Sequence, residues 1–227
     1  MKRPSLKIDI LTLFPKLLAE PLDESMARQA KKRGRVRIQI HNLRDFALDK
    51  HRTCDSKPFG GGAGMVMMVQ PIFDCLSKIS RGGWRVLVSP RGKVFTQAIA
   101  KRLAQKKHLI FICGHYEGVD ERVHEHLADE EISLGDFVTT GGEFPALCFI
   151  DAIIRLVPGV LGNQSSLVSE SFSNGLLDFP QYARPRKFRG WKVPEVLFSG
   201  HHRAIESWRT GKAFRITKRF RPDLILK

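Results

Sequence analysis

The chain has 227 residues, 42% of them hydrophobic, which suffices for one full core with a smaller second part. Its formal charge of +15 is the electrostatic pattern of a protein that meets phosphates. A merely soluble charged surface is the alternative, but the charge is uneven: 13 Lys or Arg and only 4 Asp or Glu fall between Gly175 and Lys227. No window approaches eighteen uninterrupted apolar residues, which excludes a membrane span, and the start MKRPSLKIDILTLFP lacks the features of a secretory signal.

The first elements follow from short apolar patterns. Residues 6–13 are apolar and β-branched enough for a buried strand, and Phe14-Pro15 starts a predicted helix that runs to Met26 and is closed by Gly34. The alternation over 36–40 predicts a half-exposed strand. Residues 42–68 then form a charged and later glycine-rich loop, long enough to be functional or mobile.

From Gln70 onward, helices and strands alternate. The pattern predicts helices to Ile79, from Thr96, and over 120–127, with strands over 84–88, over 108–113 and near Ile132. Such alternation indicates an α/β fold with a mostly parallel sheet and helices on its faces. A further helix, with Pro145 in its first turn, runs to Val157 and is stopped by Pro158-Gly159.

A linker separates this core from a basic carboxy-terminal region. Residues 159–174 hold five serines, two glycines and one charged residue, Glu170, without a helical or strand period. We therefore predict a core domain over 1–160, a linker over 161–174 and a basic domain over 175–227 with a helix around 201–208.

Three glycine turns follow three of the apolar strands. They are Ser89-Pro90-Arg91-Gly92, Gly114-His115-Tyr116-Glu117-Gly118 and the stretch SLGDFVTTGGE over 133–143. Glycine lets the backbone approach a ligand closely. Ligands of open α/β sheets bind outside the carboxyl ends of the strands, so three such turns on one edge predict one pocket.

Common nucleotide and metal motifs are missing or weak. The run 60–64 fails the G-x-G-x-x-G pattern, and no phosphate-loop motif exists, which disfavours Rossmann dehydrogenases and P-loop NTPases. His124 and His126 lie two apart on a predicted helix and so face different sides, which disfavours a metal site. The four cysteines have no zinc spacing and are predicted to be buried thiols of a reduced, cytoplasmic protein: Cys54, Cys75, Cys113 and Cys148.

Two ionisable residues near the linker have two interpretations each. Arg155 either pairs with Asp151 four residues earlier on the helix or faces the pocket. Glu170 is either a solvated loop carboxylate or, if the linker folds over the pocket, a general base tuned by desolvation.

Several segments resemble one family. MVMMVQP over 65–71, CGHYEGVDERV over 113–123, SLGDFVTTGGEFPA over 133–146, SESFSNGLLDFPQYARP over 169–185 and VPEVLFSGHH over 193–202 are similar to the bacterial tRNA (guanine-N1)-methyltransferases, the TrmD family. The similarity is ordered and covers almost the whole chain.

The resemblance implies a SPOUT-type α/β domain with a deep trefoil knot, a small mainly helical C-terminal domain, and a homodimer whose partner subunit completes each S-adenosylmethionine pocket. It places the cofactor against the three glycine turns, at Pro90, Gly114, Tyr116, Glu117, Leu134, Gly135, Phe137, Val138, Thr139, Gly141 and Gly142.

The resemblance also implies the reaction, which is methylation of N1 of the guanine immediately 3′ of the anticodon in tRNA. N1 carries a proton, so a base must remove it while a cation stabilises charge at O6. The matching positions hold Glu170, where the family has Asp, and Arg155. His115 replaces a frequent Arg, and Glu117 is the candidate ligand for Mg²⁺.

The tRNA is expected to contact the loop over 44–57 and the carboxy-terminal region, with its target base flipped into the pocket. Candidate phosphate contacts are Arg184, Arg186, Lys187, Arg203, Arg209 and Lys218. The alternatives are a catalytically silent RNA-binding protein with the same fold and a Rossmann methyltransferase of small molecules. The second would need a glycine fingerprint after the first strand, where 12–15 offers none.

Overall fold

The computed structural model describes residues 4–79, 82–162 and 170–226, which form two compact units. Unit 1 is Met1–Gly162 and unit 2 is Asn163–Lys227. Half of the predicted linker, 163–169, lies outside the described residues. Within the described part of the chain, no helix has the length and apolar character needed to cross a membrane.

Unit 1 is built on a five-stranded sheet in which every neighbouring pair of strands runs parallel. The strand order is β2-β1-β6-β5-β7. The strands are β1 (Leu6–Thr12), β2 (Val36–Asn42), β5 (Trp84–Val94), β6 (His108–Cys113) and β7 (Glu130–Ser133). This sheet confirms the predicted α/β class, whereas the knot implied by the resemblance stays a prediction.

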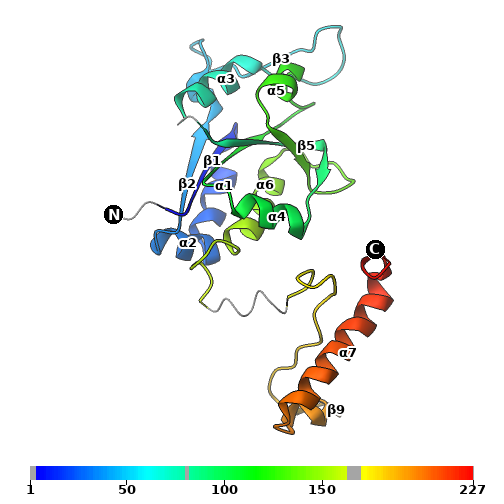
Figure 1. Cartoon of the computed structure of the whole chain (residues 1–227). Coiled ribbons are helices and arrows are strands. Elements are labelled where there is room, and N and C mark those ends of the chain that lie inside the picture. The colour runs from blue at the N-terminus through cyan, green and yellow to red at the C-terminus, as the bar shows by residue number, and fades with distance from the viewer. Residues whose placement is uncertain (1–3, 80–81, 163–169, 227) are drawn as a thin grey trace. The chain divides into compact units, whose positions relative to one another are not determined.

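Helices cover both faces of the sheet, as Figure 1 shows. One face carries α1 (Lys16–Ala19), α2 (Ser25–Lys32), α4 (Gln97–Ala104) and α6 (Glu143–Ile154). The other carries α3 (Val69–Lys78) and α5 (Glu121–His126). The alternation of β1 explains the two cores, because Ile8 and Ile10 point to the first face and Leu11 to the second.

Two predicted helix starts are confirmed by their caps. The Thr96 hydroxyl accepts a hydrogen bond from the Ile99 N–H, and the Asp120 carboxylate accepts one from the Arg122 N–H at 3.0 Å. Each capping side chain accepts from a backbone N–H of the first helical turn, which has no carbonyl partner within the helix. The residue types at these positions therefore fix where α4 and α5 begin.

The first predicted helix is wrong in one respect, because the structure divides it. Pro21 ends α1 and opens a short 3-10 helix (Pro21–Asp23), after which α2 starts anew. Proline lacks the N–H that a continuing α-helix needs. Gly34 follows α2 with φ of +64°, which confirms it as the closing residue.

The predicted turn over 89–92 lies inside a longer strand. β5 continues to Val94, and its pairing with β7 shifts register between Val88 and Lys93. The turn is thus an irregularity within one strand, and Pro90 lies within the shifted stretch between Val88 and Lys93. Pattern alone missed this because the proline and glycine interrupt the apolar run.

The 42–68 segment is mostly loop but contains a 3-10 helix (Leu43–Phe46) and a small ladder of β3 (Asp55–Ser56) with β4 (Val66–Met67). One expectation about cysteines is also wrong. Cys54, Cys75 and Cys113 are buried, but Cys148 is exposed because it lies on the outer face of α6 with Phe144.

Unit 2 is held by one long helix, α7 (His202–Phe220), which extends well beyond the predicted 201–208. It also contains the hairpin of β8 (Lys187–Phe188) and β9 (Trp191–Lys192), with 3-10 helices over Glu195–Phe198 and Pro222–Leu224. The buried Thr217 hydroxyl accepts a hydrogen bond from the Leu177 N–H at 2.9 Å and so ties the preceding chain to α7.

Candidate functional site

The three glycine turns line one cavity of about 360 Å³. It lies beyond the carboxyl ends of β6 and β7 and beside the register shift within β5, the strand that pairs in parallel with both. The predicted cofactor residues that line it are Pro90, Gly114, Tyr116, Glu117, Leu134, Phe137, Val138, Thr139, Gly141 and Gly142. Gly135 is not among the lining residues.

Backbone hydrogen bonds hold the turns against each other. The Gly142 N–H donates to the Gly114 carbonyl at 2.8 Å, and His115 bridges Gly141 in an antiparallel pair. The Thr139 hydroxyl donates to the Gly141 carbonyl at 2.9 Å. Gly135 acts within its own turn, where its carbonyl accepts from the Phe137 N–H at 2.9 Å.

Glycine is required at two of these positions. A Cβ on Gly142 would lie 3.0 Å from the Cys113 Cα and 3.1 Å from the Gly114 nitrogen. A Cβ on Gly141 would collide with the side chains of Glu143 and His115. The resulting cradle of bare backbone fits a nucleoside, whose polar edge can pair with exposed N–H and C=O groups.

A buried carboxylate lies beneath the cradle. Glu143, the first residue of α6, is 1% exposed and accepts a hydrogen bond from the Thr12 hydroxyl at 2.6 Å. Its other oxygen lies 3.6 Å from His115 Nδ1. Burial and the charge of Glu143 raise the pKa of the Cys113 thiol well above its ordinary value. Sequence reasoning missed Glu143, although a lone acid opening an apolar helix was the available signal.

The tyrosine of the second turn has an unusual backbone. Tyr116 has φ of +60°, and its ring packs edge-on against His115 with centroids 4.8 Å apart. Burial raises the pKa of the Tyr116 phenol, and Asp55 raises it further. The left-handed backbone is a cost that tertiary contacts must offset, as is common at binding sites.

The glycine-rich loop over 60–64 leads into this wall of the cavity. The Glu117 N–H donates to the Met65 carbonyl and the Met67 N–H to the Gly118 carbonyl, both at 3.0 Å. A Cβ on Gly64 would collide with the Glu117 side chain. The loop therefore ends in fixed contact with the second turn.

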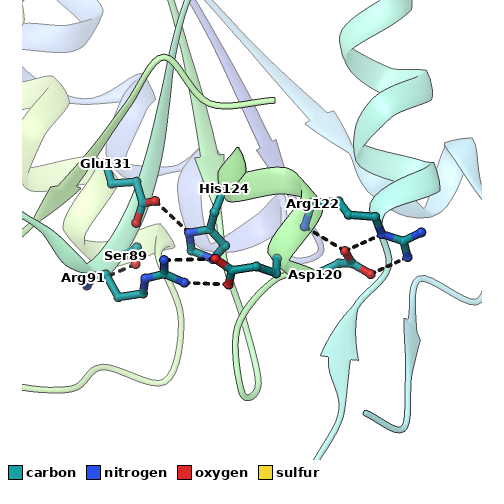
Figure 2. A network of polar contacts seen from close by, with 7 residues as sticks. Ser89, Arg91, Asp120, Arg122, His124 and Glu131 are labelled. Atoms are coloured by element: carbon teal, nitrogen blue, oxygen red, sulfur yellow. Dashed lines mark hydrogen bonds and ion pairs between the residues drawn. The ribbon is translucent and has the colours of Figure 1, made fainter. Parts of the chain in front are cut away.

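Ion pairs border the cavity beside α5, as Figure 2 shows. The Arg91 guanidinium donates to Glu121 at 2.7 Å, which raises the pKa of Arg91 and lowers that of Glu121. His124 Nδ1 lies 2.8 Å from a Glu131 carboxylate oxygen. This contact ties α5 to β7, and the expectation that His124 and His126 bind no metal stays a prediction.

A metal site built by several protein ligands is not found in the described ranges, where no three His, Cys, Asp or Glu residues gather. Glu117 is a single exposed carboxylate on the cavity wall. Mg²⁺ keeps several waters and takes one or two protein carboxylates. The residues therefore fit a mostly hydrated ion and no more.

The two predicted catalytic residues lie in different units. Arg155 is half-buried at the C-cap of α6 in unit 1 and does not line the cavity. Glu170 is half-buried in unit 2, where its carbonyl accepts from the Ser173 N–H at 3.0 Å. Their joint action on one substrate stays a prediction.

The six candidate phosphate contacts of the carboxy-terminal region belong to unit 2, whereas the loop over 44–57 belongs to unit 1. Five of them are exposed: Arg184, Arg186, Lys187, Arg203 and Lys218. Arg209 is half-buried, with its guanidinium 4.8 Å from the Phe179 ring centroid. Arg209 therefore has a packing role, and so does the exposed Arg186, whose guanidinium lies 4.3 Å from the Phe198 ring centroid.

Known proteins resemble this chain over nearly its whole length. The family model described as tRNA (Guanine-1)-methyltransferase TrmD matches residues 6–227. The chain is 53% identical to the tRNA (guanine-N(1)-)-methyltransferase of Clostridium beijerinckii over 224 residues, covering 98% of the chain and 93% of the relative. It is 50% identical to those of Dehalococcoides mccartyi and Geobacillus kaustophilus, covering 98% and 97% of the chain and 91% of each relative.

Proposed function

The chain belongs to the tRNA (guanine-1)-methyltransferase family, and we infer that it methylates N1 of a guanine in tRNA with S-adenosylmethionine as the methyl donor. The target is the guanine immediately 3′ of the anticodon. The observation that carries this inference is the full-length family match joined to a glycine cradle at one cavity. Because tRNA is the substrate, the location that follows is the cytoplasm.

The cradle supports a role for backbone groups in holding the donor. Adenosine would bind along the turns at Gly114, Gly141 and Gly142. A Cβ would meet backbone atoms at Gly142 and the side chains of Glu143 and His115 at Gly141. Pro90, Tyr116 and the 134–139 segment close the walls. Bound there, S-adenosylmethionine supplies an electrophilic methyl group on a sulfonium.

Glu170 and Arg155 are the proposed catalytic pair. The Glu170 carboxylate takes the N1 proton of guanine, and the freed N1 electron pair forms the bond to the methyl carbon while the carbon–sulfur bond breaks. The products are N1-methylguanine and neutral S-adenosylhomocysteine. The Arg155 guanidinium stabilises the negative charge that develops at O6. In the sequence, Arg155 is the C-cap of α6, and Glu170 follows directly after residues 163–169.

Mg²⁺ is proposed as a hydrated ion held by Glu117 alone. The support is the single carboxylate on the cavity wall and the low demand of Mg²⁺ for protein ligands. The proton removal assigned to Glu170 involves neither Glu117 nor the ion.

A homodimer with the pocket at the subunit interface is also proposed. Large apolar side chains beside the cavity are exposed in the single chain: Phe137 by 57%, Val138 by 88% and Phe144 by 53%. Clustered apolar exposure of this kind marks protein interfaces. A second copy covering them would enclose the cavity.

Methyl transfer and cofactor binding, measured separately, test the function. We expect the natural chain to transfer radiolabelled methyl to tRNA, and Glu170→Gln to reduce transfer roughly 100-fold or more while S-adenosylhomocysteine binds with unchanged affinity by calorimetry. Glu170→Asp is the matched control and should keep substantial transfer. Cofactor and tRNA binding without transfer by the natural chain would instead establish a silent RNA-binding protein.

A further inference from the structure

The hairpin of unit 2 is exposed and strongly basic. Every residue over 181–192 is exposed, and residues 179–194 contain five Lys or Arg and no Asp or Glu. A polar surface loop without function usually mixes both signs of charge. This segment is therefore suited to a polyanion.

Two aromatic rings are presented at the tip of the hairpin. Phe188 and Trp191 pair across the ladder and are 54% and 72% exposed, with ring centroids 6.0 Å apart. Arg189 and Gly190 between them have φ of +46° and +89°, as a two-residue turn with both central φ values positive requires. The tight turn fixes both rings on the same face of the ladder.

The cations around these rings are costly for the hairpin itself. Lys187 and Lys192 are directly paired across the strands, and like charges in this position destabilise a ladder. Among the described residues, neither lysine nor Arg189 forms an ion pair. Arg189 instead lies 5.6 Å from the Phe188 ring centroid. Within the part of the chain that the structure describes, these three cations therefore lack a carboxylate partner.

The base of the hairpin is anchored. The Val193 N–H donates to the Arg186 carbonyl at 3.0 Å, and the Arg186 guanidinium lies 4.3 Å from the Phe198 ring centroid. Arg186 therefore supports the hairpin, while Lys187, Arg189 and Lys192 remain for a ligand.

We propose that the hairpin over 187–192 binds an unpaired nucleotide of RNA, with a base stacked on Trp191 and Phe188 and adjacent phosphates on Lys187, Arg189 and Lys192. Aromatic platforms flanked by cations are the general means of holding single-stranded nucleic acid. An apolar protein partner is disfavoured by the five cations. That the RNA is tRNA rests on the proposed function.

Direct RNA binding without the methyl donor tests this proposal. The probes are a short single-stranded oligouridylate and an RNA duplex of equal length, titrated by fluorescence anisotropy. We expect Trp191→Ala to weaken binding of the single strand roughly tenfold and binding of the duplex by less than about twofold. Trp191→Phe should restore most of the affinity, and Phe73→Ala, which removes a similarly exposed ring from unit 1, should change neither.

The phosphate contacts have a separate readout. Lys187→Gln with Lys192→Gln should reduce the slope of log affinity against log salt by roughly 1.4 for the single strand. Circular dichroism of each variant checks that unit 2 stays folded.

Equal affinities of Trp191→Ala and the natural chain for single strands would overturn the proposal. A Trp191→Ala variant that changed its oligomeric state but not its RNA affinity would assign the hairpin to a protein contact instead. Failure of methyl transfer with Trp191-dependent RNA binding would overturn only the proposed function.

Discussion

Asp9 shows how a single buried charge is accommodated in the sheet. Its side chain is fully buried on β1, with Lys7 Nζ at 2.8 Å, His41 Nε2 at 2.7 Å and His108 Nε2 at 2.6 Å. Burial raises the pKa of Asp9, but hydrogen bonds from His41, Lys7 and His108 lower it more, to about 2. The cluster links β1 to β2 and β6 on one face of the sheet.

The low pKa of Asp9 predicts a definite dependence of stability on pH. The folded value of about 2 lies below the ordinary 3.8, so the contribution, on the order of 2 kcal/mol, is fully present above about pH 4 and is lost as the pH falls toward 2. Asp9→Asn should lower the free energy of unfolding by about 2 to 4 kcal/mol at pH 7.

Urea unfolding at pH 7, 4 and 2.5 checks this prediction. The difference in free energy of unfolding between the natural chain and Asp9→Asn should become smaller at the lowest pH. Asp45→Asn, which breaks an exposed pair with Arg52, is the control and should cost less than about 1 kcal/mol. A gap that stays constant across this range contradicts the assignment.

The cradle yields a second prediction for a single residue. Gly141→Ala should weaken binding of S-adenosylhomocysteine by roughly 100-fold or more, because the added Cβ meets the buried Glu143 side chain and the half-buried His115 side chain and pushes the turn into the cavity. Calorimetry measures the affinity. Gly162→Ala adds the same methyl group into open space and should bind normally. Full binding by Gly141→Ala would show that the cradle tolerates a side chain and does not position the cofactor.

Among the secondary-structure elements, those predicted best carry their own boundary chemistry. Thr96 and Asp120 cap their helices, and the apolar run over 108–113 becomes the buried strand β6. The elements predicted poorly depend on distant contacts. The length of α7 was missed because its polar and apolar residues follow no clear face, while Thr217 is buried through a contact forty residues away.

Helix α6 yields the prediction at this scale. Its inner face is core, and Leu147 packs against that core, but Phe144 and Cys148 are exposed on the outward side. If a second copy covers this face, Phe144→Lys should shift the chain from dimer to monomer in sedimentation equilibrium, because a lysine cannot be desolvated there without a partner. Phe73→Lys on α3 is the control and should leave the dimer intact. A natural chain that is monomeric at micromolar concentration would contradict the proposed dimer.

For the whole molecule, the site was predictable only in part. The glycine turns over 114–118 and 133–143 are visible in the sequence after apolar runs, and the carboxyl ends of parallel strands lie at one edge of a sheet. The order β2-β1-β6-β5-β7 is not visible, because it depends on pairing β1 with β6, as in Lys7 with His108. The bond from Thr12 to Glu143 is not visible either, since it joins residues 131 positions apart. Periodicity carries no information on such pairings.

The charge distribution of the whole chain predicts different salt dependences for tRNA binding and for cofactor binding. Unit 2 carries most of the exposed cations proposed for RNA, whereas the cradle holds its nucleoside through uncharged backbone groups. Each phosphate neutralised by Lys or Arg releases condensed counterions, so affinity for tRNA should fall on the order of 100-fold between 50 and 200 mM salt. Affinity for S-adenosylhomocysteine should change by less than about twofold, because it brings no phosphate to the site.

Filter binding for tRNA and calorimetry for the nucleoside, at matched salt concentrations, provide the comparison. The Lys218→Gln variant, which removes one exposed cation of α7, should lower the salt slope by about 1 if that side chain meets a phosphate. Parallel salt dependence of both ligands would mean that the cavity, too, relies on charge, and would contradict a cradle made of backbone groups.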